Sequence, residues 1–289
     1  STDEKLQRRF AQEAKALALL NHDNVVRVYD FEQVGGLSLL VMDPVEGVPL
    51  DGWVKEHGVV SEEDAWQLLL QMARALEHAA EHDLIHRDVK PANVLIGPDG
   101  APRITDFGLA RLVDGSHSLT QDGDLVGTPV YMSPEQIQGT LAKIGPTTDV
   151  WALGVILYVA LTGKLPFPGR TVDEVSRGVV QKEPAPPSKI ADVPEDLERI
   201  CLAAMRKDPA LRYRSAGELV RDLEAYQRGR PILAGAVTPS VRVRRVGRFM
   251  RLHLRVVVAL GVVCGFSLGA FGLASAISQR AAERGSRAL

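Results

Sequence analysis

Apolar positions recur with helical and strand periods along the first part of the chain. Residues 3–20 place apolar side chains at positions 6, 10, 14, 17 and 20, which predicts an amphipathic helix. Two short apolar runs, 25–31 and 37–42, flank a Gly-Gly pair and predict a β-hairpin. Residues 61–83 begin with Ser61 and a run of carboxylates, as a capped helix does, and predict a long helix.

Two later segments are apolar on every side. Residues 149–163 are too short to cross a bilayer and predict a helix buried in a domain core, followed by two or three amphipathic helices that end near Tyr226. Residues 256–278 contain no charge over 23 positions, enough for a helix to span a hydrocarbon core of about 30 Å. A buried globular helix is the alternative, but such helices rarely run so long without a charge on any face.

These patterns divide the chain into four parts. We expect a globular domain over residues 1–229, a basic juxtamembrane linker over 230–255, a transmembrane helix over 256–278 and a short tail over 279–289. More arginines precede the apolar segment than follow it, which places the globular domain on the cytoplasmic side of the cell membrane. The linker has no acidic residue and can also lie on anionic lipid. The arginines that set this orientation are Arg242, Arg244, Arg245, Arg248, Arg251 and Arg255 before the segment and Arg280, Arg284 and Arg287 after it.

Glycines recur at every fourth position within the apolar segment, at Gly261, Gly265 and Gly269. A stripe of small residues lets two membrane helices pack closely, which favours a homodimer. Glycine is also common in membrane helices generally, so its frequency there is the alternative explanation.

Composition narrows the function classes. The chain has 289 residues, of which 45% are hydrophobic and 24% charged, which is enough for a sizeable core. A net charge of -2 and an aromatic content of 5% argue against nucleic acid as a partner. The two cysteines, Cys201 and Cys264, lie far apart and predict neither a disulfide framework nor a metal site.

Polar side chains with catalytic chemistry cluster between two short apolar runs at 84–96, which we expect to be strands. Asp88 can accept a proton from a bound hydroxyl, and Lys90 can hold a negative group during its transfer. Asn93, and Asp106 after the next predicted strand, offer oxygen atoms to a hard cation such as Mg²⁺. A hydroxyl acceptor with two metal ligands is the set that phosphoryl transfer needs, although the first loop alone could simply be solvated.

Four ordered motifs give these residues a family. The sequences HRDVKPAN at 86–93, DFG at 106–108, GTPVYMSPE at 127–135 and DVWALG at 149–154 resemble those of the eukaryotic-like serine/threonine protein kinases of bacteria. The resemblance covers residues 3 to about 229. It implies an α+β, protein-kinase-like fold with a mostly helical lower lobe and a truncated upper-lobe sheet. It also implies ATP and Mg²⁺ as cofactors and proteins as substrates.

The resemblance assigns catalytic roles position by position. Asp88 matches the catalytic base, and Lys90 matches the lysine that accompanies serine/threonine preference. Asn93 and Asp106 match the two Mg²⁺ ligands, and Thr128 matches the threonine that lies near the base.

Further positions match the nucleotide site of the family. Met42 matches the gatekeeper, and residues Asp43 to Val45 match the hinge, where Pro44 removes one amide donor but the N–H of Val45 remains for adenine. Leu95 matches the residue that packs under the adenine ring. Glu13 matches the helix glutamate that grips a strand lysine.

Structural and regulatory positions also match. Glu135 should form an ion pair with Arg212. Asp149 should hold the backbone of the catalytic loop, residues 86–93, which contains Asp88. Arg87 beside Asp88 implies regulation by phosphate on the loop between Asp106 and Glu135, where Thr120 aligns best with the family's modified position.

The chain departs from the family at its start. The glycine-rich turn and the strand lysine that precede the first helix in the family have no counterpart here, so Glu13 has no strand lysine to grip. We expect the chain to be a fragment of a complete, active kinase. The alternatives are an inactive, kinase-shaped binding module on the membrane and, more remotely, a small-molecule phosphotransferase of related fold.

Overall fold

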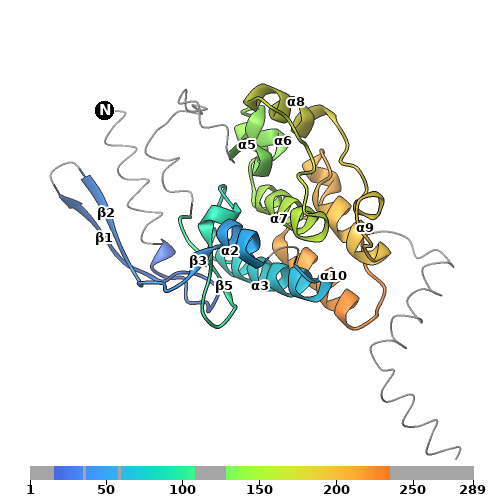
Figure 1. The fold of residues 1–289 in the computed structure, drawn as a ribbon. Helices are drawn as coiled ribbons and strands as arrows, with labels where there is room; N and C mark the ends of the chain where they lie inside the picture. Colours follow the sequence, from blue (N-terminus) through green and yellow to red (C-terminus); the bar gives the residue numbers. More distant parts are fainter. Residues whose placement is uncertain (1–15, 35–36, 58–59, 108–127, 235–289) are drawn as a thin grey trace, which may run out of the picture. The chain divides into compact units, whose positions relative to one another are not determined.

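The computed structural model describes residues 16–34, 37–57, 60–107 and 128–234 (Figure 1). The chain divides into two units, Ser1–Gly235 and Ala236–Leu289, and every described residue belongs to the first. Most of the helix predicted at residues 3–20 and the whole apolar segment 256–278 therefore lie outside the described residues.

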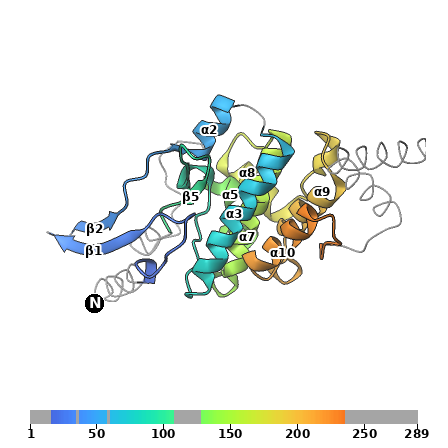
Figure 2. The same ribbon diagram turned by 90° about the horizontal axis from the view of Figure 1, so that it is seen from below.

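A β-hairpin begins the described part of the upper lobe (Figures 1 and 2). Strand β1 (Val28–Val34) pairs antiparallel with β2 (Leu37–Met42), which confirms the predicted hairpin. Strand β1 starts three residues after the beginning of the apolar run 25–31, because the first residues of that run bond to Ile104 at the end of the later strand near residue 104 instead. Val25 forms an isolated parallel bridge with Ile104, and the N–H of Val26 donates to the Ile104 carbonyl at 2.9 Å.

A second, three-stranded antiparallel sheet lies beside the catalytic loop. Its order is β3 (Val48–Pro49), β4 (Val94–Ile96) and β5 (Pro102–Ile104), and β4 follows the short helix η1 (Pro91–Asn93). The strand predicted next to residue 93 is confirmed. The strand predicted at residues 84–85 is wrong, because these residues continue the turn that ends the preceding helix and the N–H of Leu84 donates to the Ala79 carbonyl at 3.0 Å.

Long helices form the core of the lower lobe. Helix α3 (Glu62–Ala80) is capped by Ser61, whose hydroxyl accepts the N–H of Asp64, and it packs against α7 (Pro146–Thr162) and α10 (Ala216–Gln227), as Figure 2 shows. The remaining helices surround this group. They are α2 (Leu50–His57), α5 (Thr128–Tyr131), α6 (Pro134–Ile137), η2 (Leu141–Lys143), α8 (Val172–Gln181), η3 (Pro187–Lys189), α9 (Glu195–Ala204) and η4 (Pro209–Leu211).

Helix α7 is buried on nearly all sides, as its uniformly apolar sequence predicts. Trp151, Leu153 and Leu157 are almost completely shielded from solvent, and the helix packs against α3 and α9. The helix starts at Pro146, three residues before the apolar run. It ends at Gly163, whose φ of 66° is a left-handed conformation that glycine adopts at low cost and other residues do not. Its first turn carries Asp149 toward the catalytic loop. No helix within the described ranges is both long and apolar enough to cross a membrane.

Candidate active site

The buried carboxylate of Asp149 holds the start of the catalytic loop. Its two oxygens accept the backbone N–H groups of His86 and Arg87, each at 2.8 Å. Arg87 has a φ of 64°, a conformation that costs free energy for a residue with a Cβ and persists only when its surroundings fix it. Burial raises the pKa of Asp149, and the two N–H donors together with the charge of Arg87 offset part of that effect. The α7 helix therefore fixes the loop backbone directly before Asp88.

His86 connects this loop to the segment that leads to Asp106. The imidazole is fully buried, and its Nδ1 accepts the N–H of Asp88 at 3.3 Å. Because Nδ1 is an acceptor, Nε2 carries the proton and donates to the Thr105 carbonyl at 2.9 Å. The ring also lies 4.5 Å from that of Phe107, centroid to centroid. One side chain thus sets the spacing between Asp88 and Asp106.

Asp88 is held by two neighbouring side chains. Lys90 Nζ lies 2.8 Å from Asp88 Oδ2, and the Asn93 amide nitrogen donates to the same oxygen at 3.1 Å and to the Asp88 carbonyl at 2.9 Å. The Asp88 and Lys90 side chains remain about a quarter exposed, at 22% and 26%. The carboxylate is therefore oriented but open to a bound hydroxyl group.

Asn93 and Asp106 are brought together by the backbone. The N–H of Thr105 donates to the Asn93 carbonyl at 3.0 Å, so Asp106 directly follows the residue that is hydrogen-bonded to Asn93. Since the amide nitrogen of Asn93 is used by Asp88, its Oδ1 is left for another partner. Asp106 is exposed and has a φ of 56°, so the backbone turns sharply at this residue, just after the end of β5.

This donor set fits Mg²⁺ better than a metal that requires several protein ligands. The described residues contain no group of three or more His, Cys, Asp or Glu side chains that could hold a metal ion. Mg²⁺ is usually held by one or two protein carboxylates together with water and substrate phosphates. Asp106 supplies one carboxylate of that kind, and Asn93 supplies an amide oxygen.

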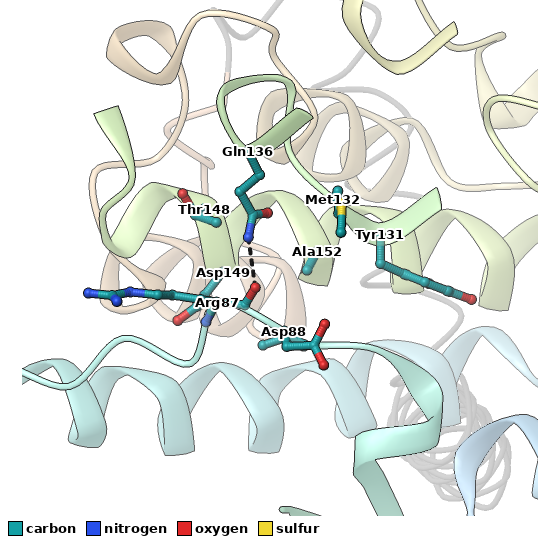
Figure 3. A pocket seen from close by; sticks show the side chains of 9 residues that line it. Arg87, Asp88, Tyr131, Met132, Gln136, Thr148, Asp149 and Ala152 are labelled. Carbon is teal, nitrogen blue, oxygen red and sulfur yellow. Dashed lines mark hydrogen bonds between the residues drawn. The ribbon is translucent and has the colours of Figure 1, made fainter. Parts of the chain in front are cut away.

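A small pocket lies beside Asp88, between the loop and helices α6 and α7 (Figure 3). The side chains of Arg87 and Asp88 point in opposite directions, and Gln136 donates to the Arg87 carbonyl at 2.7 Å. Burial, and then the charge of Asp51, raise the pKa of Tyr131 to about 12, so its hydroxyl stays protonated. The lining residues are Arg87, Asp88, Val89, Tyr131, Met132, Gln136, Thr148, Asp149 and Ala152.

The structure brings Glu135 and Arg212 together in a buried ion pair. Arg212 Nη1 lies 2.9 Å from Glu135 Oε1, and Nη2 lies 3.2 Å from Oε2. The Thr148 hydroxyl also donates to Glu135, and the guanidinium carbon of Arg212 lies 5.2 Å from the centroid of the Trp151 ring. Burial alone would raise the pKa of Glu135, but the hydrogen bonds and charge of Arg212 outweigh it and lower that pKa.

The hinge positions lie at the end of β2. Met42 is half-buried against the core, and the N–H of Asp43 donates to the Arg27 carbonyl at 2.9 Å. The Tyr29 hydroxyl donates to Asp43 Oδ1 at 2.7 Å, an anchor that the spacing of residues along the chain did not indicate. Val45 is half-buried.

The other predicted site residues are described in part or not at all. Leu95 is half-buried on β4, opposite Arg103 of β5. Thr128 begins α5, but its side chain, like Glu13 and Thr120, lies outside the part of the chain that the structure describes.

Residues 1–222 match the protein kinase domain. The chain is 40% identical over 235 residues to the serine/threonine-protein kinase PknA of Mycobacterium tuberculosis, covering 80% of this chain and 53% of PknA. It is 39% identical over 227 residues to PknB of Mycolicibacterium smegmatis and 37% identical over 227 residues to a probable serine/threonine-protein kinase of Clostridium perfringens. These two alignments cover 76% and 78% of this chain and 36% and 33% of the relatives.

A solved structure shares the fold. The chain matches Rad53 residues 1–466 in complex with AMP-PNP with a TM-score of 0.62 and 28% sequence identity, over 74% of this chain and 53% of that one. The chain spans between a third and about half of the length of the curated relatives it matches. Because the domain match covers most of its residues, the chain belongs to the protein kinase family.

Proposed function

We propose that this chain provides the catalytic part of a serine/threonine protein kinase, which transfers the γ-phosphoryl group of ATP to a protein hydroxyl. The observation that carries the proposal is the arrangement of Asp88, oriented by Lys90 and Asn93 and still open to solvent. A carboxylate held in this way, within reach of a bound hydroxyl group, is suited to accept its proton.

The residues around that carboxylate can support direct transfer of the γ-phosphoryl group to a substrate hydroxyl. The substrate hydroxyl oxygen forms a bond to the γ-phosphorus as the bond to the β,γ-bridging oxygen breaks, and ADP leaves. Asp88 takes the hydroxyl proton, and Lys90 holds the phosphoryl oxygens through its ammonium group. Asn93 and Asp106 would hold Mg²⁺, which would supply positive charge to the phosphate oxygens.

The hinge and the loop supply the other proposed contacts. Adenine binds at the backbone of Asp43 to Val45, beside Met42 and above Leu95. Thr128 lies near the proton acceptor, and Glu13 belongs to the phosphate-binding machinery. Phosphate on Thr120 orders its loop through Arg87, since a phosphate group adds negative charge that a guanidinium binds well.

We also propose that the kinase domain is cytoplasmic and attached to the cell membrane by residues 256–278. The proposal rests on the 23 uncharged residues and on the arginine-rich linker before them. The stripe of Gly261, Gly265 and Gly269 supports a homodimer, in which one copy can phosphorylate the other.

Phosphoryl transfer is tested through the Mg²⁺ ligand Asp106. The full-length protein should transfer ³²P from γ-labelled ATP to serine or threonine of a test protein. Asp106→Asn should lower the rate by about 10²–10³-fold, because it removes the anionic ligand that would hold Mg²⁺, whose positive charge stabilises the phosphate oxygens. Asp99→Asn is the matched control, since Asp99 is an exposed carboxylate that pairs with Arg103 in the nearby β4–β5 turn. Mg²⁺-dependent nucleotide binding without transfer would instead favour an inactive, kinase-shaped binding module.

Membrane attachment is tested by fractionation of cells. The chain should remain in the membrane pellet after alkaline carbonate extraction. Phe266→Arg combined with Leu268→Arg should release it, because each arginine at a helix centre costs about 2.5–3.5 kcal/mol of insertion free energy. Ala282→Arg, outside the apolar segment, should leave it in the pellet. Recovery of the unchanged chain in the supernatant would contradict the proposal.

A further inference from the structure

Three imidazole rings form a row where the first described segment meets the end of α3. His22 precedes β1, whereas His78 lies in the last turn of α3 and His82 just beyond it. The ring centroids of His22 and His78 are 5.5 Å apart, and those of His78 and His82 are 4.7 Å apart. None of the three belongs to the active site described above.

His22 accepts a backbone hydrogen bond that protonation would remove. The N–H of Asn24 donates to Nδ1 of His22 at 3.0 Å, so the neutral ring carries its proton on Nε2. An imidazolium has no acceptor nitrogen, and its formation breaks this bond. Burial, then the neighbouring His78, and to a smaller extent Arg74, lower the pKa of His22, while Asp23 opposes them.

The other two rings make contacts within α3 and the turn that follows it. His82 Nδ1 lies 2.9 Å from the carbonyl oxygen of His78, so it acts as the donor. His78 Nδ1 lies 3.7 Å from a Glu81 carboxylate oxygen, a contact that a positive ring strengthens. His78 Nε2 is buried without a hydrogen-bond partner among the described residues.

Asn24 fixes the segment 22–26 to the lower lobe. Its side chain is buried and donates to the Pro102 carbonyl at 2.8 Å and to Gln71 of α3 at 3.2 Å. Its own carbonyl accepts the N–H of Ile104 at 2.9 Å. Strand β5 ends at Ile104, two residues before Asp106, while segment 22–26 leads into β1, which pairs with β2 and the hinge positions after it. The contact of Asn24 with β5 thus joins two elements of the proposed nucleotide site.

We propose that His22, packed in a row with His78 and His82, forms a pH-sensitive joint that loosens segment 22–26 from β5 when His22 becomes protonated. Protonation of His22 removes the His22–Asn24 bond and places a positive charge 5.5 Å from the centroid of the His78 ring. Asp23 and Glu81 face the cluster as counter-charges, and Arg74 adds to the repulsion.

The direction of the effect follows from the sign of the shift. Because the folded protein lowers the pKa of His22 below 6.5, it favours the neutral ring, and the unfolded chain binds more protons at mildly acidic pH. The stabilisation is complete above pH 6.5 and is lost as the pH falls below it.

The test is amide hydrogen exchange of segment 22–26 and of β5 in the full-length protein, corrected for intrinsic rates, at pH 7.5 and 5.5. Protection should fall between about twofold and tenfold on acidification, which corresponds to the loss of one hydrogen bond. His22→Asn should remove this change, because an asparagine oxygen can accept the N–H two residues ahead and does not titrate. His57→Asn is the matched control, since His57 is an exposed ring stacked on Trp53 in α2.

Each outcome decides the proposal. Equal protection at both pH values in the unchanged chain, or the same loss in His22→Asn, would overturn it. His78→Gln keeps the His22–Asn24 bond and removes the nearest ring, whose charge lowers the pKa of His22, so it should make the loss of protection on acidification smaller. Exchange is measured without nucleotide, so this result is independent of the proposed kinase activity. If that activity is present, the affinity for ADP with Mg²⁺ should fall over the same pH range in the unchanged chain only.

Discussion

Replacement of Asp88 by Asn is expected to reduce phosphoryl transfer by about 10²–10⁴-fold, the usual contribution of a positioned proton acceptor. Asparagine has the same shape, and the backbone N–H at position 88 can still donate to His86. The substitution removes the negative charge of Asp88, whose Oδ2 forms an ion pair with Lys90 Nζ at 2.8 Å. The rate should therefore fall while nucleotide binding and the midpoint of thermal unfolding change little.

The measurement is the initial rate of ³²P transfer at saturating ATP, together with the dissociation constant of ADP and a thermal unfolding curve. Asp173→Asn is the control, because Asp173 is 76% exposed on α8. An Asp88→Asn protein that keeps more than about a tenth of the rate would exclude Asp88 as the proton acceptor. A large fall in unfolding midpoint would assign Asp88 a structural role instead.

Residues close together in the sequence were the easiest part of the site to predict. Asp88, Lys90 and Asn93 fall within six positions, and a short loop between α3 and β4 necessarily brings them together. The elements around them carry clear patterns: Ser61 caps α3, and α7 is apolar on every side. Family motifs then supplied partners that are distant in sequence, such as Glu135 and Arg212.

Contacts that depend on tertiary packing left no local signal. Gln136 is an ordinary polar residue in the sequence, yet it binds the Arg87 carbonyl. The row of His22, His78 and His82 joins segments more than fifty positions apart, and no sequence period relates them. The apolar pair Leu84–Ile85 resembled a strand, but the turn that ends α3 uses the N–H of Leu84. At these positions the hydrogen bonds and contacts formed in the folded protein, rather than local strand or helix propensity, determine the conformation.

Breaking the buried ion pair of Glu135 and Arg212 is expected to lower the free energy of unfolding by about 3–5 kcal/mol, because the remaining charge would be buried without its partner. The two side chains are only 2% and 0% exposed. Glu135→Gln keeps the volume and leaves the guanidinium with the carbonyls of Arg206 and Thr147. Arg212→Met leaves those carbonyls and the carboxylate without their donor, and should be the more severe change.

Denaturant unfolding of both single variants and of the double variant measures the pair directly. The double variant should be less destabilised than the sum of the two single changes, since neither charge is then left alone. The matched control is the exposed pair of Asp173 and Arg177, which are 2.7 Å apart and 76% and 61% exposed. Asp173→Asn should cost only about 0.2–1 kcal/mol. If Glu135→Gln and Asp173→Asn lowered the free energy of unfolding equally, burial would not determine the strength of the Glu135–Arg212 contact.

The same pair predicts a pH dependence with a definite sign. Because Arg212 lowers the pKa of Glu135 in the folded protein, the unfolded chain binds the proton more readily, and stability rises with pH in the acidic range. The contribution is complete above the ordinary glutamate pKa of about 4.3 and is lost as the pH falls through the lowered value. Glutamine at position 135 does not titrate, so Glu135→Gln should show a shallower acid slope than the unchanged chain. A slope equally steep in both proteins would place the acid-sensitive carboxylate elsewhere.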